Sequence, residues 1–118
     1  MNFLPCTIEG NQAMVGDMAI RIDDKTADLG AKAKGKIELG IRPLYLEIHN
    51  KKVEGSVPTT VKSIEDQGNY KIVTAVLGNN NILRARLPEG KPAPFEKAWI
   101  KFSEHWIRLF SDDILLTT

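Results

Sequence analysis

The sequence predicts an all-β protein made of short antiparallel strands that form one or two small barrels, or a sandwich. Short runs of alternating or β-branched apolar residues recur along the chain. Turn-forming groups of glycine, asparagine and aspartate separate these runs at nearly regular intervals. The length of 118 residues fits a single domain, 1–118. Closing such a sheet would remove exposed strand edges, which otherwise favour aggregation.

In the first half of the chain, each apolar run ends at a turn signal or a polar loop. Pro43 ends one strand because proline has no N–H to donate to a neighbouring strand. The segments 23–26 and 30–35 are polar or rich in glycine and lysine, and we expect exposed loops there. A helical turn is possible within 27–34, but its glycines disfavour a long helix. The extended segments expected here are 3–8, 13–15, 18–22, 36–42 and 44–48.

In the second half, alternation is clearest where Ile82, Arg84 and Arg86 alternate with leucine and alanine. A hairpin turn is expected at 78–81. The charged, turn-like segment 50–55 is the best candidate for an internal boundary between two linked subdomains. The strands expected here are 56–64, 70–77, 82–87, 98–102 and 106–110, followed by an irregular tail at 114–118.

Composition limits the classes of function. The net charge is +1, whereas a protein that binds nucleic acid through its phosphates normally carries a basic excess. No apolar stretch approaches the roughly 20 residues that span a bilayer, and the start lacks the pattern of a signal peptide. Cys6 is the single cysteine, so an internal disulfide is excluded. We therefore expect a cytoplasmic protein without membrane insertion that does not bind nucleic acid.

The sequence offers little for catalysis. No Gly-x-x-x-x-Gly-Lys-Ser/Thr motif is present, and the lysine-rich segment 30–36 lacks the hydroxyl residue that such a loop needs. His49 and His105 stand alone and are expected to be surface or half-buried side chains instead of metal ligands. Cys6 lies in an apolar strand and is expected to be a small buried hydrophobe. We expect no catalytic residue, cofactor or metal in this chain.

The paired aspartates and the aromatic residues can each be interpreted as functional or as structural. Aspartates at 23–24 and 112–113 could perform acid–base chemistry in a cleft, but their polar surroundings favour solvated turns. Tyr70, Trp99, Phe102 and Trp106 could form a ligand-binding face. The interpretation we favour is that Phe102 and one tryptophan fill the barrel while the other tryptophan covers its rim.

Two longer motifs carry a family resemblance. The chain begins Met1-Asn2-Phe3-Leu4-Pro5, and 39–43 reads Leu-Gly-Ile-Arg-Pro, which includes Gly40, Arg42 and Pro43. In this order they resemble the C-terminal TOBE (transport-associated OB) domain of sugar-importer ABC ATPases, where Asn-Phe-Leu-Pro is followed later by Leu-Gly-Ile-Arg-Pro-Glu-His. The chain departs from that pattern at Leu44 and Tyr45, so no role is carried over for the acidic-histidine pair.

Two weaker motifs extend the resemblance over nearly the whole chain. A Gln-Gly-Asn turn containing Gly68 stands where the family has Leu-Gly and a polar residue. Leu109 and Phe110, followed by two aspartates, look like the family's closing strand. The resemblance implies an OB-like barrel, and it implies that Arg42 and Pro43 fix the end of a strand.

The resemblance also implies a role and its partners. The chain would be a regulatory and dimerisation domain of an importer ATPase that takes up a sugar or sugar phosphate. ATP and Mg²⁺ would belong to the parent protein, whose nucleotide-binding domain is one expected partner. A second copy of the chain and, through the parent, the membrane subunits would be the others, which places the chain at the inner face of the cell membrane. Exposed positions in 23–36 and 79–81 are candidate contacts.

Two alternatives stay open. Related TOBE-type domains bind oxyanions such as molybdate, so the chain could be a small-ligand module. It could also be an OB-type binder of single-stranded nucleic acid, although the near-neutral charge argues against this.

Overall fold

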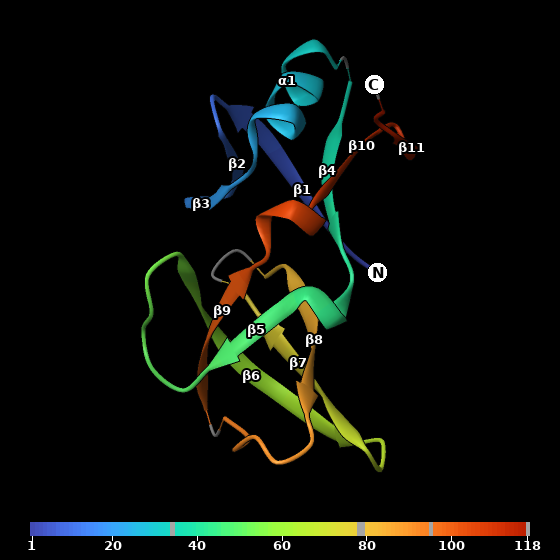
Figure 1. The fold of residues 1–118 in the computed structure, drawn as a ribbon. Helices are drawn as coiled ribbons and strands as arrows, with labels where there is room; N and C mark the ends of the chain where they lie inside the picture. The colour runs from blue at the N-terminus through green and yellow to red at the C-terminus, as the bar shows by residue number, and fades with distance from the viewer. Residues whose placement is uncertain (34, 78–79, 95, 118) are drawn as a thin grey trace.

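Two antiparallel sheets, one above the other in Figure 1, make up the computed structural model. The structure describes residues 1–33, 35–77, 80–94 and 96–117. The all-β fold expected from the sequence is confirmed, and its strands form an OB-like architecture. The first sheet has the order β11 (Ile114–Leu115), β10 (Arg108–Ser111), β4 (Ile37–Ile41), β1 (Asn2–Glu9), β2 (Gln12–Val15) and β3 (Met18–Arg21). The second has the order β5 (Leu46–His49), β9 (Lys97–Phe102), β6 (Ser56–Asp66), β7 (Tyr70–Val76) and β8 (Ile82–Pro88).

The first sheet buries one face of each central strand. Leu4 on β1, Leu39 on β4 and Leu109 on β10 lie in register and are almost fully buried. They face the same side because alternate residues of a strand point to the same face. The helix α1 (Asp24–Lys32) packs near this side, against β1 and β10.

The helix corrects the expectation of exposed loops at 23–26 and 30–35. Asp23 caps it: its side chain accepts a hydrogen bond from the backbone N–H of Thr26 at 2.8 Å. Gly30, which we took as a helix breaker, lies where a Cβ atom would be 2.8 Å from Cγ1 of Ile8 and 2.9 Å from Cδ1 of Leu109. The glycine therefore allows the helix to approach the sheet closely. Lys34 lies outside the described residues.

The second sheet curls until its end strands, β5 and β8, approach each other, so that it forms a nearly closed barrel. Its interior is filled by inward residues such as Val73, Leu83, Ala85 and Ile100, all fully buried. The alternation expected at 82–87 is confirmed, because the leucines and alanine are buried and the arginines lie outside.

The chain crosses between the sheets twice, at 42–45 and 103–107, and not at 50–55 as we expected. The segment 50–55 joins β5 to β6, which belong to one sheet. Each crossing contains a 3₁₀ turn, η1 (Pro43–Tyr45) and η2 (Glu104–Trp106). The rings of Tyr45 and Trp106 stack with centroids 4.2 Å apart and planes 4° apart, which ties the two crossings together.

Placement of the aromatic residues only partly matches expectation. Phe102 is buried, but neither tryptophan fills the barrel: Trp106 is 47% exposed and Trp99 is half-buried on the outer face of β9. The prediction of a core tryptophan was therefore wrong. Trp106 stacks on Tyr45 at the crossing between the sheets, and the sequence does not reveal this contact because Tyr45 lies 61 positions earlier.

Candidate functional site

Some residues of the family-like motifs are buried and hold the fold together, and others lie on one exposed surface. Asn2 and Leu4 are buried, Pro5 is exposed, and Phe3 is 48% exposed. Asn2 joins the two sheets: its side-chain amide donates to the backbone oxygen of Ile41 at 3.3 Å and of Arg84 at 2.8 Å. The N–H of Arg84 donates back to the Asn2 side-chain oxygen at 2.8 Å. The buried half of the motif thus fixes how the sheets meet.

Phe3 belongs to an exposed apolar patch on the outer face of the first sheet. The register of β1, β4, β10 and β11 places Phe3, Pro5, Phe110 and Leu115 on the same side. Glu38 and Arg108 share this side and give the patch charged neighbours. The rings of Phe3 and Phe110 meet edge to face with centroids 5.2 Å apart. We call the four apolar residues the outer patch.

Gly40 makes room for this patch. A Cβ atom at Gly40 would lie 2.6 Å from Cε1 of Phe110 and 3.1 Å from the sulfur of Met1. The glycine of the Leu-Gly-Ile-Arg-Pro motif is therefore required by the ring that crosses over it. Leu109, the neighbour of Phe110, points inward and is 2% exposed.

The remaining motif residues shape the backbone. Pro43 starts η1, and the oxygen of Arg42 accepts a hydrogen bond from the N–H of Tyr45 at 3.0 Å. The Arg42 side chain is exposed and makes no hydrogen bond or ion pair with the described residues. Gly68 has φ +96° in the turn between β6 and β7, where its N–H donates to Asp66.

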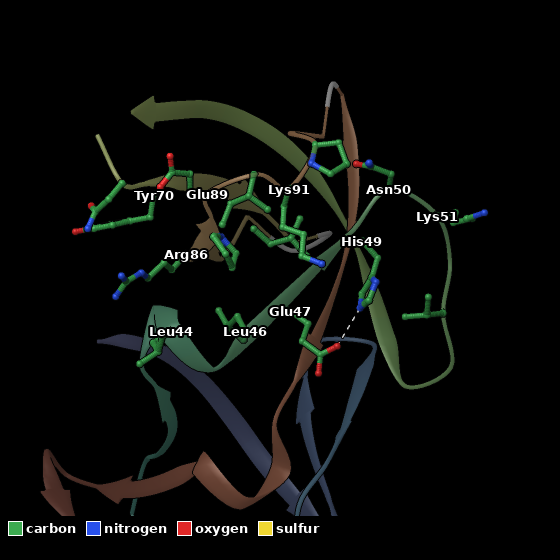
Figure 2. Close-up of a pocket in the computed structure, with 16 residues that line it drawn as sticks. Leu44, Leu46, Glu47, His49, Asn50, Lys51, Tyr70, Arg86, Glu89 and Lys91 are labelled. Atoms are coloured by element: carbon green, nitrogen blue, oxygen red, sulfur yellow. Dashed lines mark hydrogen bonds and ion pairs between the residues drawn. The ribbon is translucent and has the colours of Figure 1, made fainter. Parts of the chain in front are cut away.

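A pocket of about 710 Å³ lies at the seam where β5 and β8 approach each other. Figure 2 shows its lining, with Tyr70, Arg86 and Leu44 toward one end, His49 and Lys91 toward the other, and Leu46 between them. We call it the seam pocket. No local motif signals it, because its walls come from 44–53, 69–70 and 86–92, which are adjacent only in the fold.

Specific contacts order both ends of the seam pocket. The guanidinium carbon of Arg86 lies 4.0 Å from the centre of the Tyr70 ring, a cation–π contact. At the other end, Nε2 of His49 lies 3.2 Å from a carboxylate oxygen of Glu47. The pocket thus has an apolar centre and charged ends.

Three other side chains that could carry chemistry lie apart from this pocket. Burial raises the pKa of the Cys6 thiol to about 11, which keeps it protonated and unreactive at neutral pH. His105 is largely exposed, with Nδ1 3.9 Å from Asp23. Asp112 lies in the turn before β11, where its N–H donates to the oxygen of Lys36 at 3.1 Å. In the described part of the chain, no three His, Cys, Asp or Glu side chains gather as a metal site would require.

The structure places most of the two segments, 23–36 and 79–81, that were candidates for contact with a partner. Most of 23–36 is the helix α1, which presents exposed residues along one side. Asn80 takes φ 67° in the turn before β8, and Asn79 lies outside the described residues. Within the described ranges, no helix has the length and apolar character needed to cross a bilayer.

Comparison with known proteins finds similarity to one family model and to solved structures. Residues 1–43 match the family model of the MalK OB fold domain. The structure is similar to that of the cytoplasmic molybdate-binding protein ModG, solved with molybdate bound, with a TM-score of 0.69 and 14% sequence identity. The superposition covers 93% of this chain and 95% of that chain. A search of curated proteins gave no match. The similarity to the solved structure confirms the fold over nearly the whole chain. The match to the family model confirms the resemblance over residues 1–43.

Proposed function

We propose that this chain, a TOBE-like OB fold whose first 43 residues match the MalK OB fold domain, is an accessory domain of an ABC importer ATPase. In this role it regulates the motor and helps hold two copies of it together. The chain itself breaks no bond, while ATP and Mg²⁺ act in the nucleotide-binding domain of the parent protein. The imported solute is a sugar or a sugar phosphate, and the domain sits in the cytoplasm beneath the membrane subunits.

One observation carries this proposal: the matched segment contributes the two central strands of a sheet whose outer face exposes apolar side chains next to Glu38 and Arg108. Residues 1–43 supply β1 and β4, and β1 carries Phe3 and Pro5 of the outer patch, while β10 and β11 carry its other two residues. Phe3 and Leu115 are 48% and 44% exposed. Exposed apolar patches of this kind often mark contacts with another protein. A docking function accounts for the patch and requires no active site.

Two measurements test the accessory role. An ATPase assay on this chain should show no turnover above buffer, and measurable hydrolysis would contradict the proposal. Light scattering should show a concentration-dependent homodimer that Phe3→Ser weakens by about tenfold, since burying a large apolar side chain contributes roughly 1.5–3 kcal/mol. Ile82→Ser is the matched control, because Ile82 is 58% exposed but lies on β8, away from the outer patch. A strictly monomeric chain at high concentration would remove the dimerisation part of the proposal.

The second candidate is an oxyanion-binding module, favoured by the shared fold with a molybdate-binding protein. Such sites hold an anion with backbone amides and small polar side chains. Calorimetry with molybdate and tungstate separates the two roles: tight binding at a fixed stoichiometry supports the module, and an absence of heat supports the docking role alone.

A further inference from the structure

The seam pocket contains backbone groups of β8 that have no strand beside them. Asn2 binds both the N–H and the C=O of Arg84, so these groups point away from β7. The pairing of β7 with β8 is continuous, and residues two apart on a strand direct their backbone groups to the same side. The N–H and C=O of Arg86 therefore point into the seam, where β8 is the end strand of its sheet.

The facing edge of β5 is similar. The oxygen of Tyr45 accepts a hydrogen bond from the N–H of Ser103, which extends the pairing of β5 with β9 by one residue. Alternation then turns the backbone groups of Leu46 and Ile48 away from β9, toward the seam. The N–H of Leu46 is already used by the oxygen of Pro43. Ile48 and Arg86 thus supply backbone hydrogen-bonding groups to the two walls of the pocket.

The charges around the pocket favour an anion. Lys51, Arg86 and Lys91 line it together with two carboxylates, Glu47 and Glu89. Figure 2 shows the Lys91 side chain reaching across the pocket toward His49. The lining therefore carries an excess of positive charge, and it offers N–H donors from the backbone and from Lys91 in the same space.

The size and lining of the pocket select among anions. A volume of about 710 Å³ suits an organic molecule, whereas a bare tetrahedral oxyanion would leave most of the space unfilled. Leu44, Leu46 and Pro92 provide apolar surface for the carbon atoms of a ligand. Glu47, His49 and Asn50 provide partners for hydroxyl groups.

We propose that the seam pocket binds a small hydroxylated organic anion, either a phosphate ester or a carboxylate. The acid group lies near Lys91 and the free backbone N–H groups, and the hydroxyl groups meet the polar side chains of β5. This site goes beyond the accessory role and does not depend on it, because the pocket lies on the second sheet and the outer patch on the first.

Calorimetry on the full chain tests the site with five probes. Glucose 6-phosphate represents phosphate esters and glucuronate represents carboxylates, while glucose is their neutral counterpart. Inorganic phosphate and molybdate are the bare oxyanions. At least one organic anion should bind with a dissociation constant below about 1 mM and one site per chain. Amide NMR signals of Ile48 and Arg86 should shift with that ligand.

Variants separate this site from adventitious binding. Lys91→Ala should weaken binding about tenfold, the usual effect of losing a hydrogen bond to a charged group. Arg86→Ala should weaken it less, because the backbone N–H stays and only a positive charge at the far end of the pocket is lost. Lys52→Ala is the matched control, since Lys52 is an exposed lysine of the neighbouring loop and does not line the pocket. Its affinity should equal that of the unmodified chain.

Each contrary outcome overturns the proposal. It fails if neither organic anion binds, if glucose binds as tightly as the organic anion that does bind, or if Lys91→Ala leaves the affinity unchanged. Binding of molybdate alone would also overturn it and would support the oxyanion module instead. None of these results changes the dimerisation measured with Phe3→Ser, so failure of this site is distinguishable from failure of the accessory role.

Discussion

At the scale of single residues, short polar and small side chains set the relation between the two sheets and their surfaces. Asn2 acts as a substitute strand neighbour, because its amide binds the backbone of β8 as a paired strand would. Gly40 acts through its missing side chain, which leaves room for the ring of Phe110. Both residues belong to the motifs that carry the family resemblance. The structure explains why each position needs that residue type.

We expect Asn2→Ala to lower the free energy of unfolding by about 1–3 kcal/mol, because it removes a buried hydrogen bond to Ile41 and two partly buried ones to Arg84. Denaturant titration measures the change. Asn69→Ala, at an exposed turn position, should stay within about 0.5 kcal/mol. Equal stability of the two variants would show that Asn2 does not join the sheets.

We expect Gly40→Ala to cost about 1–3 kcal/mol, because the new methyl group would overlap the Phe110 ring. The double variant with Phe110→Leu should recover part of this loss, since the smaller side chain frees the space. If the double variant shows the plain sum of two independent losses, the contact with Phe110 is not the cause.

At the scale of elements, α1 shows how tertiary contact overrides local preference. Its glycine content predicts a loop, but close packing of Gly30 against Ile8 and Leu109 stabilises a helix. The capping aspartate was visible in the sequence as one of a pair and was taken for a turn residue. Strand positions, in contrast, were mostly predicted, because alternation of apolar residues reports directly which face is buried.

We expect Asp23→Ala to destabilise the protein by about 1 kcal/mol at neutral pH through loss of the helix cap. Hydrogen bonds from Thr26 lower the pKa of Asp23 in the folded protein. Its contribution is therefore present above the unfolded pKa of about 3.9 and disappears as the pH falls through the lower folded value. Thermal melts should show the two proteins converging in acid, while the surface control Asp17→Ala should match the unmodified chain throughout. A difference that persists at the lowest pH would contradict the capping role.

At the scale of the whole molecule, the two sheets form one unit through the crossings and Asn2. The stacked rings of Tyr45 and Trp106 connect the two crossing segments, which are far apart in the sequence. The outer patch lies on one sheet and the seam pocket on the other, so docking and ligand binding have separate surfaces.

We expect Trp106→Ala to lower the free energy of unfolding by about 1–2 kcal/mol, with loss of the stacked pair. Trp106→Phe keeps an aromatic ring at the crossing and should lose less than half as much. Near-ultraviolet circular dichroism and denaturant titration report the stack and the stability, respectively. An alanine variant as stable as the phenylalanine variant would mean that the rings do not hold the crossings together.

The sequence by itself determined the all-β class, most strand positions and the buried side of the strand at 82–87, because these follow from a period of two along a local segment. It also carried the family resemblance through Asn2, Gly40 and their neighbours. Only the tertiary structure decided that the sheets divide at 42–45, that Trp106 stacks on Tyr45 and that α1 forms. It alone assembled the seam pocket, since Ile48, Arg86 and Lys91 come together through long-range strand packing that no local pattern encodes.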